Sequence, residues 1–307
     1  MLLYVTPERF ERDELRVILS CGNVGFVILD EIHCLSMWGS TFRPSYKYMA
    51  RMIASESKNR FLPIYGFSAT LPEDVRIDVL TELGIDISKF REVEIDFDSD
   101  FTPDDVQIFA GNLALRGPAT RPEIKIGVIQ AKNDEDKLRK VVNTIKQLRD
   151  TLDKKGEPWI GLVFASFVRS PIIHENVDYI AKSIWEGIGE EVLYFHGQMD
   201  PDEKADVISK LERAVRLSSK PRIVVATKAF GMGVDLPNVR FVVHAHVSQS
   251  LEEYYQEIGR AGRDRKDSYA VTVFSPDDFD EKRQLIKTLK HPSLELQIMG
   301  LLMTYLK

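Results

Sequence analysis

The stretch Val27-Ile28-Leu29-Asp30-Glu31-Ile32-His33 points to an α/β fold and to a site at the end of one strand. Its apolar residues predict a short buried strand, and two carboxylates and an imidazole follow. In an open α/β sheet, ligands bind outside the carboxyl ends of the strands. Asp30 could hold a magnesium ion there, and Glu31 could polarise an attacking water. Taken alone, the same pattern would also fit a strand end with solvated acids.

Apolar runs of this kind recur along the 307 residues and alternate with helical patterns. We expect strands at 2–5, 24–29, 62–67, 124–129, 160–164, 192–195, 222–226, 240–244 and 270–274. Continuous apolar runs of this length suit a parallel sheet that is covered on both faces. Strands that alternate with helices predict an α/β fold with right-handed crossovers.

Four segments carry helix signals. Six apolar residues after Pro171 fall on one helical face: Val177, Ile180, Ala181, Ile184, Trp185 and Ile188. Asp200 before Pro201, and Thr70 before Pro72, are typical of helix starts because acids follow each proline in the first turn. Residues 133–157 predict a charged, solvated helix that ends in a turn.

The composition excludes some classes of protein. A net charge of −6 is not that of a uniformly basic nucleic-acid coat, although a local basic groove remains compatible with it. The two cysteines, Cys21 and Cys34, form no CxxC pair, so we expect free thiols and no zinc in this chain. No apolar run approaches ~18 residues, so no membrane span is expected. The start resembles no signal peptide, which favours a reducing, intracellular compartment.

A second informative stretch is Gln256-Glu257-Ile258-Gly259-Arg260-Ala261-Gly262-Arg263-Asp264-Arg265. We expect Arg260 and Arg263 to lie one turn apart on one face of a helix. Such a pair suits a polyphosphate whose charge peaks in the transition state, provided that the phosphate is held elsewhere. The alternative is a solvated helix face with ion pairs to nearby acids.

Two further strand ends carry polar residues. The hydroxyls of Ser68 and Thr70 could relay between a nucleotide site and a neighbouring domain. After the run 222–226, Thr227 opens a loop in which Gly233 allows a close backbone approach and Asp235 could accept a hydrogen bond from a ribose. Ordinary strand-to-helix turns would explain both loops when each is taken alone.

Together these motifs resemble those of the RecQ family of superfamily 2 DNA helicases, over nearly all of residues 1–285. The segment 30–33 is similar to the family's Walker B box, and 34–46 to its aromatic-rich loop. Ser68-Ala69-Thr70 is similar to the third helicase motif, 226–239 to the fifth, 255–264 to the sixth, and 195–197 to the short motif before the fifth. Met37 and Ser40 depart from the family, which commonly has Gln and His there.

The resemblance implies two RecA-like parallel-sheet domains, of which the first is incomplete. Residues 1–105 would form the partial first domain, 106–285 the second, and 286–307 the start of a further helical region. The segment 91–120 is acidic and then rich in Gly and Pro, and we interpret it as a linker at the boundary.

The resemblance also implies ATP and Mg²⁺ as cofactors. Asp30 would bind the magnesium, Glu31 would activate the water, and Arg260 and Arg263 would reach the γ-phosphate across an interdomain cleft. Gln256 would help to couple the site, as would Ser68 and Thr70. The remaining nucleotide-site residues would be His33, Gly233 and Asp235.

Single-stranded and duplex DNA are the partners that the resemblance implies. Trp38, Phe42 and Arg43 would sense single-stranded DNA, because an aromatic ring stacks on any base and a guanidinium can meet a phosphate. Thr227 and His196 would contact the DNA backbone. Core packing is the alternative for Trp38 and Phe42, and a satisfied core histidine would explain His196 equally well.

No G-x-x-x-x-G-K-[S/T] phosphate-binding loop occurs in the 307 residues. We therefore expect a fragment of a longer 3′-to-5′ DNA helicase, whose partner is the missing N-terminal half-domain of the same protein. On its own, this chain is expected to bind ATP weakly and to hydrolyse none measurably. The alternative is a non-catalytic, degenerate helicase module that binds nucleic acid or a protein. The oligomeric state is left open.

Overall fold

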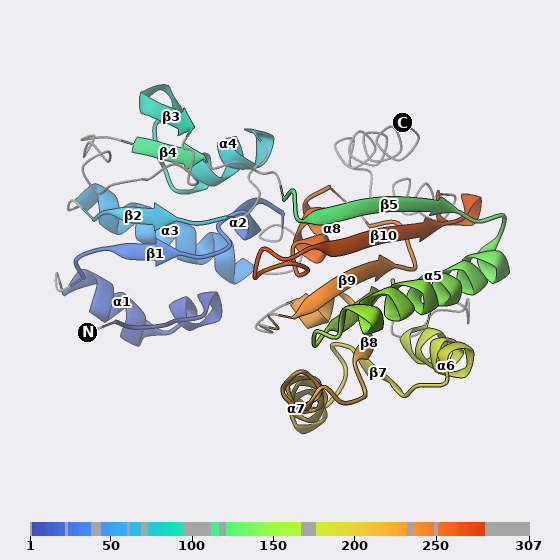
Figure 1. Ribbon diagram of the computed structural model, residues 1–307. Helices are drawn as coiled ribbons and strands as arrows, with labels where there is room; N and C mark the ends of the chain where they lie inside the picture. Colours follow the sequence, from blue (N-terminus) through green and yellow to red (C-terminus); the bar gives the residue numbers. More distant parts are fainter. Residues whose placement is uncertain are drawn as a thin grey trace. The chain divides into compact units, whose positions relative to one another are not determined.

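The computed structural model describes residues 2–21, 24–37, 44–59, 62–68, 73–94, 112–116, 121–166, 176–231, 236, 238–248 and 251–279. The chain divides into two units, residues 1–120 and 121–307 (Figure 1). The sequence interpretation placed this boundary at 105/106. Each unit has its own parallel strands and its own apolar core. The fold class is therefore α/β, as expected.

The first unit is built on two short parallel strands, β1 (Val27–Leu29) and β2 (Ile64–Gly66). Around them lie a 3-10 helix, η1, and four α-helices: η1 (Pro7–Glu11), α1 (Asp13–Ser20), α2 (Cys34–Met37), α3 (Pro44–Asn59) and α4 (Glu73–Glu82). Buried residues of α1, α3 and α4, among them Leu19, Ile53 and Val79, form one core with Leu29 at the end of β1. This packing fixes the position of the segment that follows β1.

Two expectations for the first unit are wrong. Residues 2–5 form no strand, and Tyr4 is 91% exposed, because strand propensity yields a strand only where a neighbouring strand supplies partners. The segment 91–120 is not all linker, since β3 (Phe90–Glu94) and β4 (Asn112–Arg116) pair in parallel after the short 3-10 helix η2 (Ile87–Lys89). Long-range pairing of this kind leaves no signal in local composition.

The second unit contains a six-stranded sheet in the order β5-β10-β9-β6-β8-β7, and every pair in it is parallel. Its strands are β5 (Ile124–Gln130), β6 (Ile160–Phe164), β7 (Val192–Phe195), β8 (Ile223–Ala226), β9 (Val239–His244) and β10 (Ser268–Phe274). Its helices are α5 (Asp134–Lys155), α6 (Val177–Ile188), α7 (Pro201–Leu217), the 3-10 helix η5 (Lys228–Gly231) and α8 (Leu251–Ile258). All six strands were expected from the sequence to within about two residues.

The central strands of this sheet are buried on both faces, as the continuous apolar runs predicted, whereas Ile126 on the outer strand β5 is 60% exposed. Alternate residues such as Val163 and Val225 pack on one face with α5 and α6. The intervening residues, such as Leu162 and Val224, pack on the other face with α7 and η5. In Figure 1, α5 and α6 accordingly cover one face of the sheet. Side chains of successive strand residues point to opposite faces, so one strand supplies both cores.

The helix signals are largely confirmed. Asp200 and Glu203 form a capping box at the start of α7, and Asn133 caps α5, which ends at the left-handed Gly156. The expected face of α6 is buried except for Trp185, which is 51% exposed and lies at the margin of the apolar stripe. Within the described residues, no helix is long and apolar enough to cross a membrane.

The close approach of β6 to β9 yields a stability prediction. A Cβ added at Gly161 would lie 1.9 Å from Cζ of Phe241, which is fully buried against Trp159 and has no room to move. We expect Gly161→Ala to lower the free energy of unfolding by about 2–3 kcal/mol, measured by urea denaturation. The control is Gly127→Ala on β5, where the added Cβ would meet Val271 at 3.7 Å and the effect should stay within ~0.5 kcal/mol. Equal effects of the two substitutions would contradict this packing.

Candidate functional site

The carboxylates of the first unit lie in a tight turn at the carboxyl end of β1. The parallel pairing with β2 continues on both sides of this turn, because Phe67 N donates to Leu29 O and Ile32 N donates to Phe67 O, each at 2.9 Å. Asp30 and Glu31 lie between Leu29 and Ile32. Glu31 has φ 49°, a left-handed conformation that costs a non-glycine residue ~1–2 kcal/mol. The turn therefore holds Asp30 and Glu31 at the edge of the sheet, and both are exposed.

His33 connects this turn to the end of the neighbouring strand. Its Nδ1 lies 2.9 Å from Ser68 Oγ and 3.3 Å from Glu31 Oε2, while its side chain is only 8% exposed. Its Nε2 lies 3.7 Å from the Cys34 thiol. The structure thus brings Glu31 and His33, from one predicted motif, together with Ser68, from another.

The donor atoms of this turn fit a hard cation. Carboxylate oxygens are the protein ligands that Mg²⁺ accepts, usually one or two of them together with phosphate oxygens and water. One oxygen of Asp30, Oδ1, already accepts from Glu31 N at 3.0 Å. No group of three or more His, Cys, Asp or Glu residues suited to a metal occurs among the described residues. A magnesium ion bound here would therefore take most of its ligands from a nucleotide and water.

In the second unit, the two arginines lie in a turn and not on a helix, so this expectation is wrong. Helix α8 ends at Ile258, and residues 259–264 form consecutive turns. Gly262 is left-handed at φ 63°, and its N–H donates to Val239 O at 3.1 Å, which anchors the turn to the start of β9. A Cβ there would lie 3.1 Å from both Glu123 Cγ and Lys266 O. Glycine is favoured at 262 by this crowding and by the positive φ.

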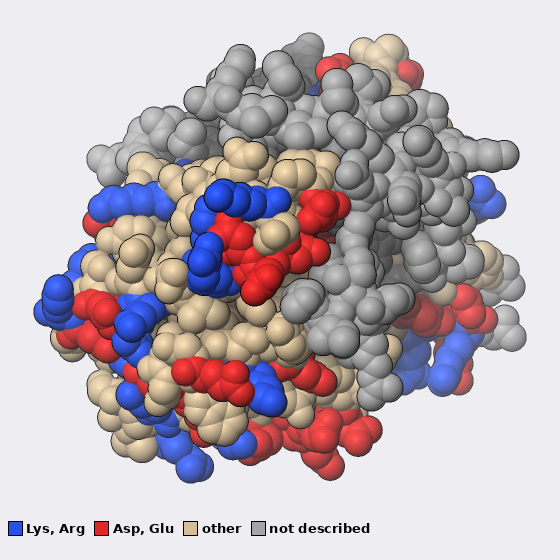
Figure 2. Space-filling model, turned by 90° about the vertical axis from the view of Figure 1, so that its right-hand side faces the viewer, with Lys and Arg blue, Asp and Glu red and all other residues tan. Residues whose placement is uncertain are grey.

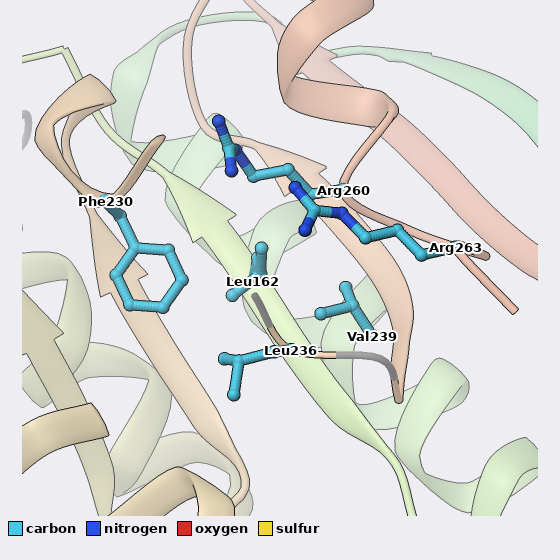
Figure 3. A pocket seen from close by; sticks show the side chains of 6 residues that line it. All are labelled: Leu162, Phe230, Leu236, Val239, Arg260 and Arg263. Carbon is cyan, nitrogen blue, oxygen red and sulfur yellow. The ribbon is translucent and has the colours of Figure 1, made fainter. Parts of the chain in front are cut away.

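Arg260 and Arg263 nonetheless line the same pocket. Its other lining residues are Leu162, Phe230, Leu236 and Val239. Figure 3 shows both guanidinium groups directed over the apolar side chains. Both arginines belong to the turn that follows α8. The turn therefore places the two positive charges close together, as the helix was expected to do.

A buried arginine that the sequence reasoning missed supports this turn. Arg240 on β9 has a side chain only 5% exposed, and it forms two hydrogen bonds with the Asp264 carboxylate, one of them from Nη1 to Oδ1 at 2.9 Å. Partial burial opposes the ionisation of Asp264, but the hydrogen bonds from Arg240 outweigh it and hold the pKa of Asp264 below its usual value. An arginine inside an otherwise apolar strand was the available signal, because a buried charge requires a partner.

A second missed cluster lies beneath α8. The Glu257 carboxylate accepts from Ser248 Oγ at 3.0 Å and pairs with His244 Nε2 at 3.0 Å, and all three residues are buried. Burial alone would raise the pKa of Glu257, but the contact with His244 outweighs it and lowers that pKa. This cluster fixes the end of α8 against β9, one turn before Arg260.

The predicted DNA-contacting residues of the second unit lie side by side. Parallel pairing places Phe195 opposite Ala226, so His196 and Thr227 follow at adjacent strand ends. Thr227 is buried, its N–H donates to Phe195 O at 3.1 Å, and its hydroxyl accepts from Ala229 N at 3.4 Å. His196 is half-buried and its ring stacks on that of Tyr194.

The other predicted site residues are placed unequally. Gln256 lies on α8 and is half-buried. Outside the described residues lie Trp38, Phe42, Arg43, Thr70, Gly233 and Asp235. On the face shown in Figure 2, basic and acidic side chains are interspersed, and the described residues there form no extended basic patch.

Comparison with known proteins gives consistent matches. The model of the DEAD/DEAH box helicase family matches residues 1–77, and that of the helicase conserved C-terminal domain matches residues 138–265. The ATP-dependent DNA helicase RecQ of Bacillus subtilis is 29% identical over 96% of this chain and 42% of its own length. The ATP-dependent helicase SGS1 of Saccharomyces cerevisiae is 28% identical over 94% of this chain and 17% of its own length.

A solved structure shares the fold. The DEAD-box helicase Mss116, bound to single-stranded RNA and UDP-BeF, matches with a TM-score of 0.61 and 17% identity, over 92% of this chain and 50% of that one. At this identity the match shows a common fold of RecA-like helicase domains, and nothing about the ligand. The chain spans less than half of the length of the curated relatives RecQ and SGS1.

The Arg240–Asp264 pair yields a prediction for stability. Asp264→Asn leaves the buried guanidinium without its counter-charge, and we expect a loss of about 2–3 kcal/mol, measured by urea denaturation at pH 7. The matched control is Asp267→Asn, which breaks an exposed, solvent-screened pair with Lys125 and should cost clearly less.

The pH dependence of this pair follows from the lowered pKa of Asp264. The stabilisation is complete above the pKa of an unfolded aspartate, near 3.9, and is lost as the pH falls through the lower, folded pKa. The difference in stability between the parent protein and Asp264→Asn should therefore persist from pH 7 to about pH 5 and shrink below pH 4. A difference that is absent at pH 7 would contradict the ion pair.

Proposed function

Because this chain belongs to the RecQ family of superfamily 2 helicases, we propose that it is the motor core of an ATP-dependent DNA helicase. It would couple ATP hydrolysis to 3′-to-5′ translocation on single-stranded DNA and to the unwinding of duplex DNA. The observation that carries the proposal is that Arg260 and Arg263 line the same pocket. Two fixed cations at one pocket suit a phosphate chain that gains charge as its terminal group is transferred.

The two units would contribute different parts of the nucleotide site. ATP with its Mg²⁺ supplies the phosphoanhydride that is hydrolysed. Asp30 would hold the cation, and Glu31 would orient the attacking water and accept its proton. Arg260 and Arg263 would stabilise the charge that develops on the phosphate, with Gln256 beside them. Gly233 and Asp235 are proposed to contact the nucleotide.

Coupling to DNA would run through the contact between His33 and Ser68. The 2.9 Å contact between Nδ1 and Oγ joins the acidic turn to the segment that leads to Thr70. A change at the carboxylates would therefore reach the loop that follows β2. Trp38, Phe42 and Arg43 are proposed to bind single-stranded DNA by stacking and phosphate contact, and His196 and Thr227 to contact its backbone.

The first test is DNA-stimulated ATP hydrolysis by the protein as its gene encodes it. Arg260→Ala should lower kcat roughly 10³-fold, because an arginine finger stabilises the transition state. Arg139→Ala is the control, since Arg139 lies on α5 with a side chain 73% exposed and should be dispensable. A parent protein that binds DNA but hydrolyses no ATP would refute the motor function and favour the non-catalytic binding module.

The second test concerns the DNA contact. Trp38→Ala should weaken binding to an unstructured oligonucleotide about 10-fold, because stacking of one base on an aromatic ring contributes ~1–3 kcal/mol. Trp185→Ala removes an exposed tryptophan on α6 and should leave the affinity unchanged. Fluorescence anisotropy at fixed salt measures both variants. Equal affinities of the parent and Trp38→Ala would remove Trp38 from the DNA site.

A further inference from the structure

Arg121, the first residue of the second unit, binds the turn that carries Arg260 and Arg263. Its Nη2 donates to Ala261 O and to Gly262 O, each at 3.0 Å, and its Nη1 lies 3.5 Å from Gly259 O. One guanidinium therefore contacts three backbone carbonyls within four consecutive residues. These carbonyls flank Arg260 and precede Arg263.

The chemistry of the turn explains why a cation lies there. Carbonyls at and just beyond the end of a helix have no helical partners, and the helix dipole leaves partial negative charge at that end. Beyond Ile258 the left-handed Gly262 bends the chain, so the carbonyls of Gly259, Ala261 and Gly262 converge on one point. A planar guanidinium can satisfy several such acceptors at once, whereas a lysine ammonium offers a single point of charge.

Arg121 is itself held in place. Its Nε hydrogen bonds to the Glu123 carboxylate, whose side chain is 11% exposed. Burial opposes the ionisation of Glu123, but the hydrogen bond from Arg121 outweighs it and lowers the pKa of Glu123. The Glu123 carbonyl accepts from Ser268 N at 2.8 Å, which ties this segment to the start of β10. The guanidinium therefore has a fixed orientation relative to the sheet.

We propose that Arg121 is a positioning residue that orients Arg260 and Arg263 toward their pocket by holding the carbonyls of their turn. The inference rests on the proposed function of these two arginines. Arg121 touches neither guanidinium, so its effect would be on geometry and not on charge. Loss of Arg121 should leave nucleotide binding largely intact and misplace the groups that stabilise the transition state.

The first arm of the test needs no catalysis and uses the 307-residue chain. Hydrogen exchange is measured for the amides of Arg260, Ala261 and Gly262, which donate to the carbonyls of Glu257, Ile258 and Val239. Arg121→Ala should speed their exchange at least 10-fold, because the turn opens more often. The control is Arg149→Ala, which removes a largely buried arginine that donates to Ile188 O at 2.7 Å and should leave these amides unchanged.

The second arm measures steady-state ATP hydrolysis by the gene-encoded protein. Arg121→Ala should lower kcat about 10-fold while KM for ATP changes less than about 2-fold, and Arg121→Lys should recover part of the loss. In an Arg260→Ala/Arg263→Ala background, Arg121→Ala should cause no further loss, because both groups through which it acts are already absent.

The outcomes separate the two ideas. If Arg260→Ala/Arg263→Ala is impaired and the addition of Arg121→Ala lowers activity multiplicatively, Arg121 acts independently of the two arginines and the positioning role is wrong. Unchanged exchange of the three amides in Arg121→Ala also overturns it. If Arg260→Ala keeps full activity, the proposed function of the arginines is wrong, and the positioning role fails with it.

Discussion

The central strands of the six-stranded parallel sheet in residues 121–279 are buried on both faces, and this burial constrains the rest of the second unit. Every residue of β6, β8 and β9 is buried. A charged side chain that enters such strands needs a partner, because an isolated buried charge costs far more than packing returns. Functional groups are therefore placed in the segments that join the strands. Arg240 is the exception within β9, and its cost is offset by the bidentate contact with Asp264.

The turn after α8 shows how a short irregular segment becomes rigid enough to present charges. It makes a few backbone hydrogen bonds of its own, such as that from Ala261 N to Ile258 O, and its neighbours supply further contacts on several sides. Gly262 N donates to Val239 O, Arg240 binds Asp264, and Arg121 binds the carbonyls. These anchors come from β9 and from the segment before β5. The direction of Arg260 and Arg263 is therefore set by the sheet, and preorganised charges lose little free energy to reorganisation when they act.

Much of the fold could be read from the sequence, for a physical reason. The strands β6 and β7 were expected with their observed bounds, since buried parallel strands are apolar at every position. Helix starts such as Asp200 were readable because caps are local. In contrast, β3 and β4 were missed, because their pairing joins residues about twenty positions apart within an acidic segment. Trp185 was grouped with the apolar face of α6, but spacing alone does not show where that face ends, and its side chain is 51% exposed.

The candidate site was predicted less evenly. Glu31, His33 and Ser68 were singled out one by one, and parallel pairing of β1 with β2 brings them together. The arginines were singled out but placed on a helix, because the turn at Gly262 is anchored by the carbonyl of Val239, which is distant in the sequence. The supports Arg121 and Arg240 were missed, since their partners lie 140 and 24 positions away. Local spacing singles out candidate site residues more readily than it singles out the residues that hold them in place.

The central claim is that these residues form the motor of a DNA helicase. It is tested most directly by strand displacement with the gene-encoded protein, on a duplex that carries either a 3′ or a 5′ single-stranded tail. The account predicts that the 3′-tailed duplex is unwound, that this requires hydrolysable ATP and Mg²⁺, and that the 5′-tailed duplex remains annealed. Displacement without ATP, or none on either substrate by a protein that binds DNA, would contradict it.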